Sequence, residues 1–112
     1  MPKPDVTQVE AIAHLDSFRT EEAFQQWVIN AAVQLGWARE LIYHTRNSRG
    51  STAGFPDLVL CRPPRLIWAE LKQPGRELIE AQELWAWALK ESGQEVYAWW
   101  PADMDTILET LK

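Results

Sequence analysis

The most regular repeat of apolar positions in this chain lies within residues 20–35. Apolar side chains recur there every three or four residues, which predicts one helix with a buried face. Ser17 or Thr20 can cap its first turn, and Gly36 can end it. The apolar positions are Phe24, Trp27, Val28, Ala31, Ala32 and Leu35.

Three shorter apolar runs predict a strand followed by a β-hairpin. Residues 41–45 form the first run, and the next two flank a turn that contains two consecutive prolines. Proline cannot adopt the positive φ of a tight primed turn, so the simplest loop has four residues, 62–65. This loop pairs Cys61 with Leu66.

Counting outward along the hairpin places Asp57 directly opposite Glu70. Directly opposed residues share one face of a sheet, with Cβ atoms about 5 Å apart, and Lys72 lies two residues further on the same face. Two opposed carboxylates repel each other, so a bound divalent cation is expected to compensate. Lys72 would then position or deprotonate an attacking water, or stabilise charge on a phosphate. A surface charge cluster at a strand end is the alternative.

A second helical pattern follows the turn at residues 73–76. Leu78, Trp85 and Leu89 would share one face of this helix, which ends near Ser92. Gln82 is the polar exception on that face, and a buried amide there must find hydrogen-bond partners.

The remaining elements complete an α/β fold. Residues 96–100 predict a last strand, broken by Pro101, and residues 103–111 predict a final helix. The order α-β-β-β-α-β-α predicts a mixed four-stranded sheet flanked by helices on both faces. Residues 1–15, with room for one short helix, are expected to be an N-terminal extension, and residues 16–112 a single domain.

The composition bears on whether the protein is disulfide-stabilised, exported or membrane-spanning. A chain of 112 residues with one cysteine excludes an intramolecular disulfide framework and suits a reducing cytoplasm. The first residues lack the apolar core of a signal peptide, and no apolar run reaches transmembrane length. A soluble, intracellular protein is therefore expected.

The net charge of −5 is unevenly distributed. Residues 46–76 contain six basic and two acidic side chains, so this segment is +4 and the rest of the chain is −9. Such a basic face can contact phosphates locally on an acidic body, although solvated charges are the plain alternative. Arg46 and Arg49 lie in a polar, glycine-containing loop that is either a DNA contact or a simple connector. Arg76 is either a phosphate contact or a solvated side chain.

The ordered motifs resemble the PD-(D/E)XK nuclease superfamily, through Pro56-Asp57 followed by Glu70-Leu71-Lys72. They are more similar still to its VRR-NUC (virus-type replication-repair nuclease) family, over residues from about 20 to 111. The matching pieces are Glu21, Phe24, Gly36-Trp37, Gly54-Phe55-Pro56-Asp57-Leu58, Ala69-Glu70-Leu71-Lys72, Gln82 and Gly93. The resemblance implies a restriction-endonuclease-like core.

The resemblance also implies a cation site. Asp57 and Glu70 would hold Mg²⁺ or Mn²⁺ together with the backbone carbonyl of Leu71. Glu21 is a further candidate ligand, and alternatively a first-turn glutamate that favours the helix dipole. Gln82 is expected beside the site, bonded to a water, the lysine or a phosphate.

The implied activity is hydrolysis of phosphodiester bonds in DNA, with Lys72 as a catalytic residue. A structure-specific endonuclease for four-way junctions or flaps in replication, repair or recombination is expected, in a bacterial or phage-encoded protein. An exonuclease, a nicking or restriction-like nuclease, and a non-catalytic DNA-binding module are the alternatives.

A homodimer is expected from the abundance of large apolar side chains. Trp99 and Trp100 must point to opposite faces of the last strand, and the helix over residues 103–111 carries an apolar stripe near them. A joined apolar patch there would mark an interface, and twofold pairing is the commonest arrangement. Burial of both tryptophans inside a monomer is the alternative.

Overall fold

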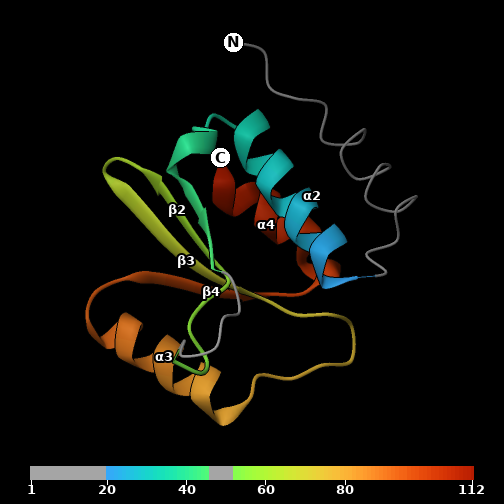
Figure 1. Ribbon diagram of the computed structural model, residues 1–112. Coiled ribbons are helices and arrows are strands. Elements are labelled where there is room, and N and C mark those ends of the chain that lie inside the picture. The colour runs from blue at the N-terminus through green and yellow to red at the C-terminus, as the bar shows by residue number, and fades with distance from the viewer. Residues whose placement is uncertain (1–19, 46–51) are drawn as a thin grey trace.

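The computed structural model describes residues 20–45 and 52–112 (Figure 1). The short helix expected within residues 1–15, together with Arg46 and Arg49, lies outside these residues. The helices are α2 (Glu21–Gln34), α3 (Glu80–Glu91) and α4 (Met104–Leu111), and the strands are β1 (Ile42–His44), β2 (Leu58–Arg62), β3 (Arg65–Leu71) and β4 (Glu95–Trp99). No helix in the described part of the chain is long and apolar enough to cross a membrane.

The strands form one mixed sheet in the order β1-β2-β3-β4. The first three strands are antiparallel, and β4 runs parallel to β3 after the α3 crossover. Helices α2 and α4 cover one face of the sheet, and α3 lies on the other (Figure 1). The predicted α/β architecture and element order are confirmed.

The hairpin has the predicted register but a shorter loop. Cys61 is opposite Leu66, as expected, and the pairing continues to Arg62 and Arg65. The loop is therefore only Pro63-Pro64, which are joined by a cis peptide bond. The prediction of a four-residue loop was wrong because Arg62 and Arg65 pair with each other and extend the ladder by one step.

The hydrophobic core lies between the sheet and helices α2 and α4. Thr20 caps α2, since its hydroxyl accepts a hydrogen bond of 3.0 Å from the N–H of Ala23. Trp37 is buried just beyond this helix, and its indole N–H donates to the carbonyl of Leu111 at 2.8 Å. The strand residues buried here are Leu58, Leu60, Ile67, Ala69, Leu71 and Trp99.

The apolar surface expected at a dimer interface is covered within the chain. Trp99 is only 2% exposed, and the apolar stripe of α4 is part of the core. Trp100 is half-buried, and its indole N–H donates to the carbonyl of Arg76 at 2.7 Å. This region therefore gives no reason for a second copy of the chain to bind there.

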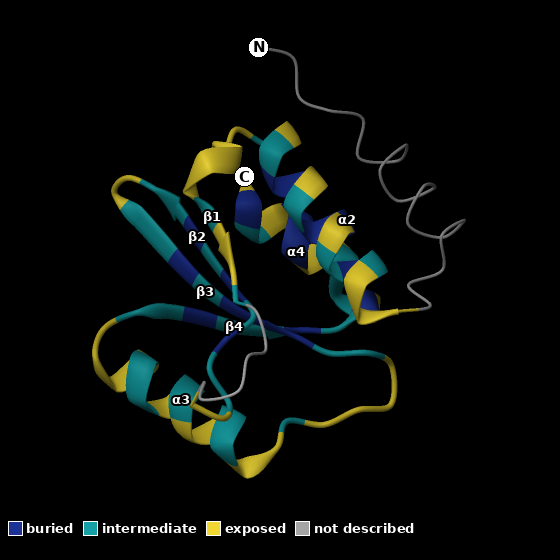
Figure 2. Ribbon diagram, in the orientation of Figure 1, coloured by how far each residue is buried: buried dark blue, intermediate teal, exposed yellow. Residues whose placement is uncertain are grey.

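Helix α3 is attached differently from the other helices. None of its residues is buried, as the absence of dark blue on α3 in Figure 2 shows. It is held through Phe55, whose ring makes edge-to-face contacts with Trp68 of β3 at 5.8 Å and with Trp85 of α3 at 5.0 Å. Such aromatic pairs stabilise packing by about 0.5–1.5 kcal/mol beyond area burial.

Candidate active site

A polar pocket lies at the end of the hairpin, on the α3 side of the sheet. Asp57 directly precedes β2, and the ladder that pairs Leu58 with Ala69 places it opposite Glu70. The N–H of Leu71 donates to Oδ2 of Asp57 at 2.8 Å, which ties this carboxylate to the backbone of β3. The pocket is lined by Glu21, Thr45, Thr52, Ala53, Gly54, Phe55, Asp57, Glu70, Lys72 and Gln82.

The structure brings together five side chains that the sequence singled out. They come from α2, the hairpin and α3, and they are Glu21, Asp57, Glu70, Lys72 and Gln82. Arg76 is exposed and does not line the pocket. Leu71 is buried on the core face and meets the site through its backbone.

Glu70 is the most perturbed group of the site. Its side chain is 8% exposed, and its pKa is raised to about 8. Burial is the main cause, the neighbouring negative charge of Asp57 adds to it, and the positive charge of Lys72 opposes it. Oε2 of Glu70 is buried and has no hydrogen-bond partner among the described residues.

Gln82 joins helix α3 to this carboxylate. Its Nε2 donates to Oε1 of Glu70 at 2.8 Å. Its Oε1 accepts a hydrogen bond of 2.9 Å from the N–H of Ile79, at the first turn of the helix. Both ends of the Gln82 amide therefore have hydrogen-bond partners, as its place on the helix required. Oε2 of Glu70 remains without one.

These residues fit a hard divalent cation. Mg²⁺ binds oxygen ligands and commonly takes one or two carboxylates, with waters and substrate phosphates completing its shell. Asp57 and Glu70 supply the carboxylates, and Oε2 of Glu70 is a buried oxygen without a hydrogen-bond donor. Glu21 lies near enough to raise the pKa of Glu70. The described residues nevertheless contain no group of three or more His, Cys, Asp or Glu side chains that could hold an ion.

Two pocket residues were missed as site residues. Thr45 was assigned to a strand, and its approach to the carboxylates depends on how β1 pairs with β2. Gly54 was noted only as part of a motif. A Cβ at Gly54 would lie 2.4 Å from the carbonyl carbon and oxygen of Ala81, so only glycine permits this approach of the chain to α3.

Two of the six basic residues counted in the sequence are structural. Arg62 donates to the carbonyls of Leu35 and Lys112, each at 3.0 Å. Arg65 forms an ion pair with Glu95 and donates to the carbonyl of Thr110 at 2.9 Å. These arginines fasten the hairpin to the C-terminal helix, which removes them from the basic surface expected to contact DNA.

Comparison with known proteins agrees with the motifs. No match is found among curated proteins. A solved structure titled "VRR_NUC domain protein" shares the fold with a TM-score of 0.66 and 21% sequence identity, covering 82% of this chain and 84% of that one. The profile of the VRR-NUC domain matches residues 7–99. The chain therefore belongs to the VRR-NUC domain family, a family of nucleases.

Proposed function

We propose that this VRR-NUC domain, residues 16–112, is an intracellular Mg²⁺- or Mn²⁺-dependent nuclease that hydrolyses phosphodiester bonds in DNA. The observation that carries the proposal is the meeting of Asp57, Glu70 and Lys72 in one pocket. The buried, unsatisfied oxygen of Glu70 supports a cation there, because a lone buried acceptor is costly without a bound group.

Each residue has a distinct part in the proposed reaction. Asp57, Glu70 and the carbonyl of Leu71 would hold the cation, with Glu21 as a further candidate. When bound, a divalent cation polarises the scissile phosphate and lowers the pKa of the attacking water. Lys72 donates hydrogen bonds that orient this water or offset the charge that develops on phosphate.

The proposed part of Gln82 is to hold the carboxylate of Glu70 in a fixed orientation. Its Nε2 holds Oε1, which restricts the rotation of the carboxylate and leaves Oε2 to the cation. Gln82 is thus a positioning residue, and its own orientation is set by the first turn of α3.

The substrate that we propose is branched DNA, either a four-way junction or a flap. Arg46, Arg49 and Arg76 are the proposed contacts to the phosphate backbone. The test is incubation of the protein with junction, flap, duplex and single-stranded DNA, in Mg²⁺, Mn²⁺ or EDTA. Cleavage of a branched substrate with either cation, and none with EDTA, is expected. An absence of cleavage in every arm would refute the proposed nuclease activity.

Replacement of Lys72 with methionine should slow the chemical step more than it weakens binding. The variant keeps an unbranched side chain of similar bulk and removes the charge, so single-turnover cleavage should fall by about 100-fold. DNA affinity, measured in Ca²⁺, should change little. A large loss of affinity with normal single-turnover cleavage would make Lys72 a phosphate contact instead.

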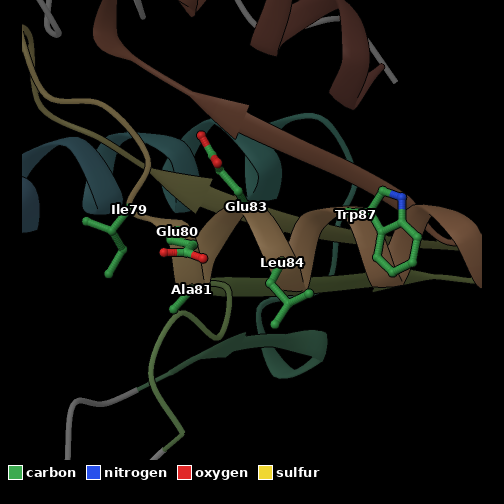
Figure 3. Close-up of a pocket in the computed structure, with 6 residues that line it drawn as sticks. All are labelled: Ile79, Glu80, Ala81, Glu83, Leu84 and Trp87. Carbon is green, nitrogen blue, oxygen red and sulfur yellow. The ribbon is translucent and has the colours of Figure 1, made fainter.

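We further propose that the nuclease is a homodimer, which would place two active sites on the two equivalent strands of a junction. The surface differs from the one expected from sequence. Ile79, Leu84 and Trp87 are 55%, 63% and 61% exposed and lie along the outer side of α3 (Figure 3). Exposed apolar patches of this kind mark interaction surfaces.

The α3 interface makes a specific prediction. Light scattering at micromolar concentration should give the mass of two chains for the wild type and of one chain for Trp87→Arg. Tyr43→Arg is the matched control, since Tyr43 is 64% exposed but lies on β1. A wild-type mass of one chain would exclude the dimer, and dissociation by Tyr43→Arg alone would move the interface to the β1 edge.

A further inference from the structure

Two buried side-chain oxygens in the described residues have no hydrogen-bond partner, and they are Oγ1 of Thr45 and Oε2 of Glu70. Both residues line the same pocket. A buried polar atom without a partner destabilises a protein, and in native structures it calls for a specific explanation such as a bound ion or a catalytic role. Because both atoms lie at one site, one bound group can explain both.

The register of the sheet shows why these residues are neighbours. Pairing of His44 with Leu58 continues by one step, and the N–H of Thr45 donates to the carbonyl of Asp57 at 2.9 Å. Asp57 is in turn opposite Glu70 across β2 and β3. Thr45, Asp57 and Glu70 therefore form one row across three strands, and side chains in such a row share one face of the sheet.

We propose that the hydroxyl of Thr45 belongs to the cation site and contributes an uncharged oxygen to it, either as a ligand or through a coordinated water. The inference rests on the proposed function, because it takes the site of Asp57 and Glu70 as given. Hydroxyl oxygens suit hard cations, and a hydroxyl adds a contact without adding a third repelling charge. The branched side chain of threonine also restricts χ1, which keeps the oxygen in place.

Thr52 offers a matched control in the same pocket. It carries the same side chain and also lines the pocket, but it is exposed, and its hydroxyl is not among the buried atoms without a partner. A general loss of pocket polarity would affect both threonines equally. A specific contact to the cation would affect Thr45 alone.

The experiment measures binding of Mn²⁺ or Mg²⁺ alone by calorimetry, to the full chain. Thr45→Val should weaken binding by about 10-fold or more, the scale found for residues that support metal ligands. Thr45→Ser, which restores a hydroxyl, should bind nearly as tightly as the wild type, and Thr52→Val should be unchanged. Thermal unfolding in EDTA supplies a second readout, in which Thr45→Val should be as stable as the wild type or more so, because it removes an unsatisfied buried group.

Three outcomes would overturn the inference. Wild-type affinity in Thr45→Val would remove the hydroxyl from the site. Equal losses in Thr45→Val and Thr52→Val would show an unspecific effect, and a lower unfolding temperature of Thr45→Val in EDTA would show a structural role. Asp57→Asn separates the two proposals: if it loses cation binding while Thr45→Val does not, only this inference fails. If Asp57→Asn binds the cation normally, the proposed function and this inference fail together.

Discussion

Replacement of Glu70 with glutamine should abolish DNA cleavage and leave the metal-free protein as stable as the wild type, or more stable. Glutamine cannot supply the charge that holds a cation, so cleavage should fall by at least about 100-fold. It resembles the protonated carboxyl in shape, and it removes the repulsion between Glu70 and Asp57. Loss of function with a gain in stability is the mark of a residue kept for chemistry.

The effect on stability should depend on pH in a defined direction. The pKa of Glu70 is raised from 4.5 to about 8 by burial and by Asp57, so the folded protein binds this proton more tightly than the unfolded chain. Its contribution to stability is complete below pH 4.5 and is lost as the pH rises to about 8. Glu70→Gln cannot lose a proton, so its advantage over the wild type should grow across this range.

Denaturant unfolding in EDTA at several pH values measures this difference, and cleavage assays with Mg²⁺ measure the loss of activity. Glu22→Gln is the control, because Glu22 is an exposed glutamate of α2 that does not line the pocket. Cleavage by Glu70→Gln at the wild-type rate would refute the site assignment. A stability difference that does not change with pH would refute the raised pKa.

Replacement of Gly54 with alanine should impair both stability and cleavage. Gly54 has a φ of +85°, and a Cβ there would lie 2.4 Å from the backbone of Ala81 and 2.7 Å from the N of Gln82. Left-handed backbone costs a residue with a side chain about 1–2 kcal/mol, and the first turn of α3 must also move to relieve the contact. Because that turn orients Gln82, its hydrogen bond to Glu70 should be lost, and cleavage should fall by about 10- to 100-fold.

Gly75→Ala is the matched control for this variant. Gly75 has a similar φ of +78°, but a Cβ there would meet nothing within 4 Å. It should lose about 1–2 kcal/mol of stability through backbone strain and keep its cleavage rate. If the two alanine variants lose equal stability and both cleave normally, the contact between Gly54 and α3 does not position the site.

Much of the site follows from local patterns in the sequence. The hairpin register depends only on the length of its two runs and on the prolines between them, so the amino-acid order is enough to place Asp57, Glu70 and Lys72 together. The place of Gln82 on an apolar helical face likewise required a hydrogen-bond partner for its amide. That this partner is Glu70 depended on how α3 packs against the sheet. Periodicity determines which face a residue occupies, and not what lies opposite.

Contacts between distant segments were decided by the tertiary structure. The row from Thr45 to Asp57 requires the pairing of β1 with β2, and a three-residue strand joined through a polar loop carries no register signal of its own. Arg62 and Arg65 have the pattern of basic surface residues, and only the folded chain brings the carbonyls of its last residues within their reach.

The amino-acid sequence by itself therefore determined the α/β order and the carboxylate pair, because these depend on short-range periodicity and on a hairpin between residues close together in the chain. The ordered motifs from Glu21 to Gly93 identified the family. The tertiary structure alone decided which apolar stripes are buried. In the folded chain, Trp99 and the apolar face of α4 are buried, whereas Trp87 of α3 is exposed. The physical reason is that an apolar helical face is stabilised by whichever surface packs against it, and a periodic pattern does not specify that surface.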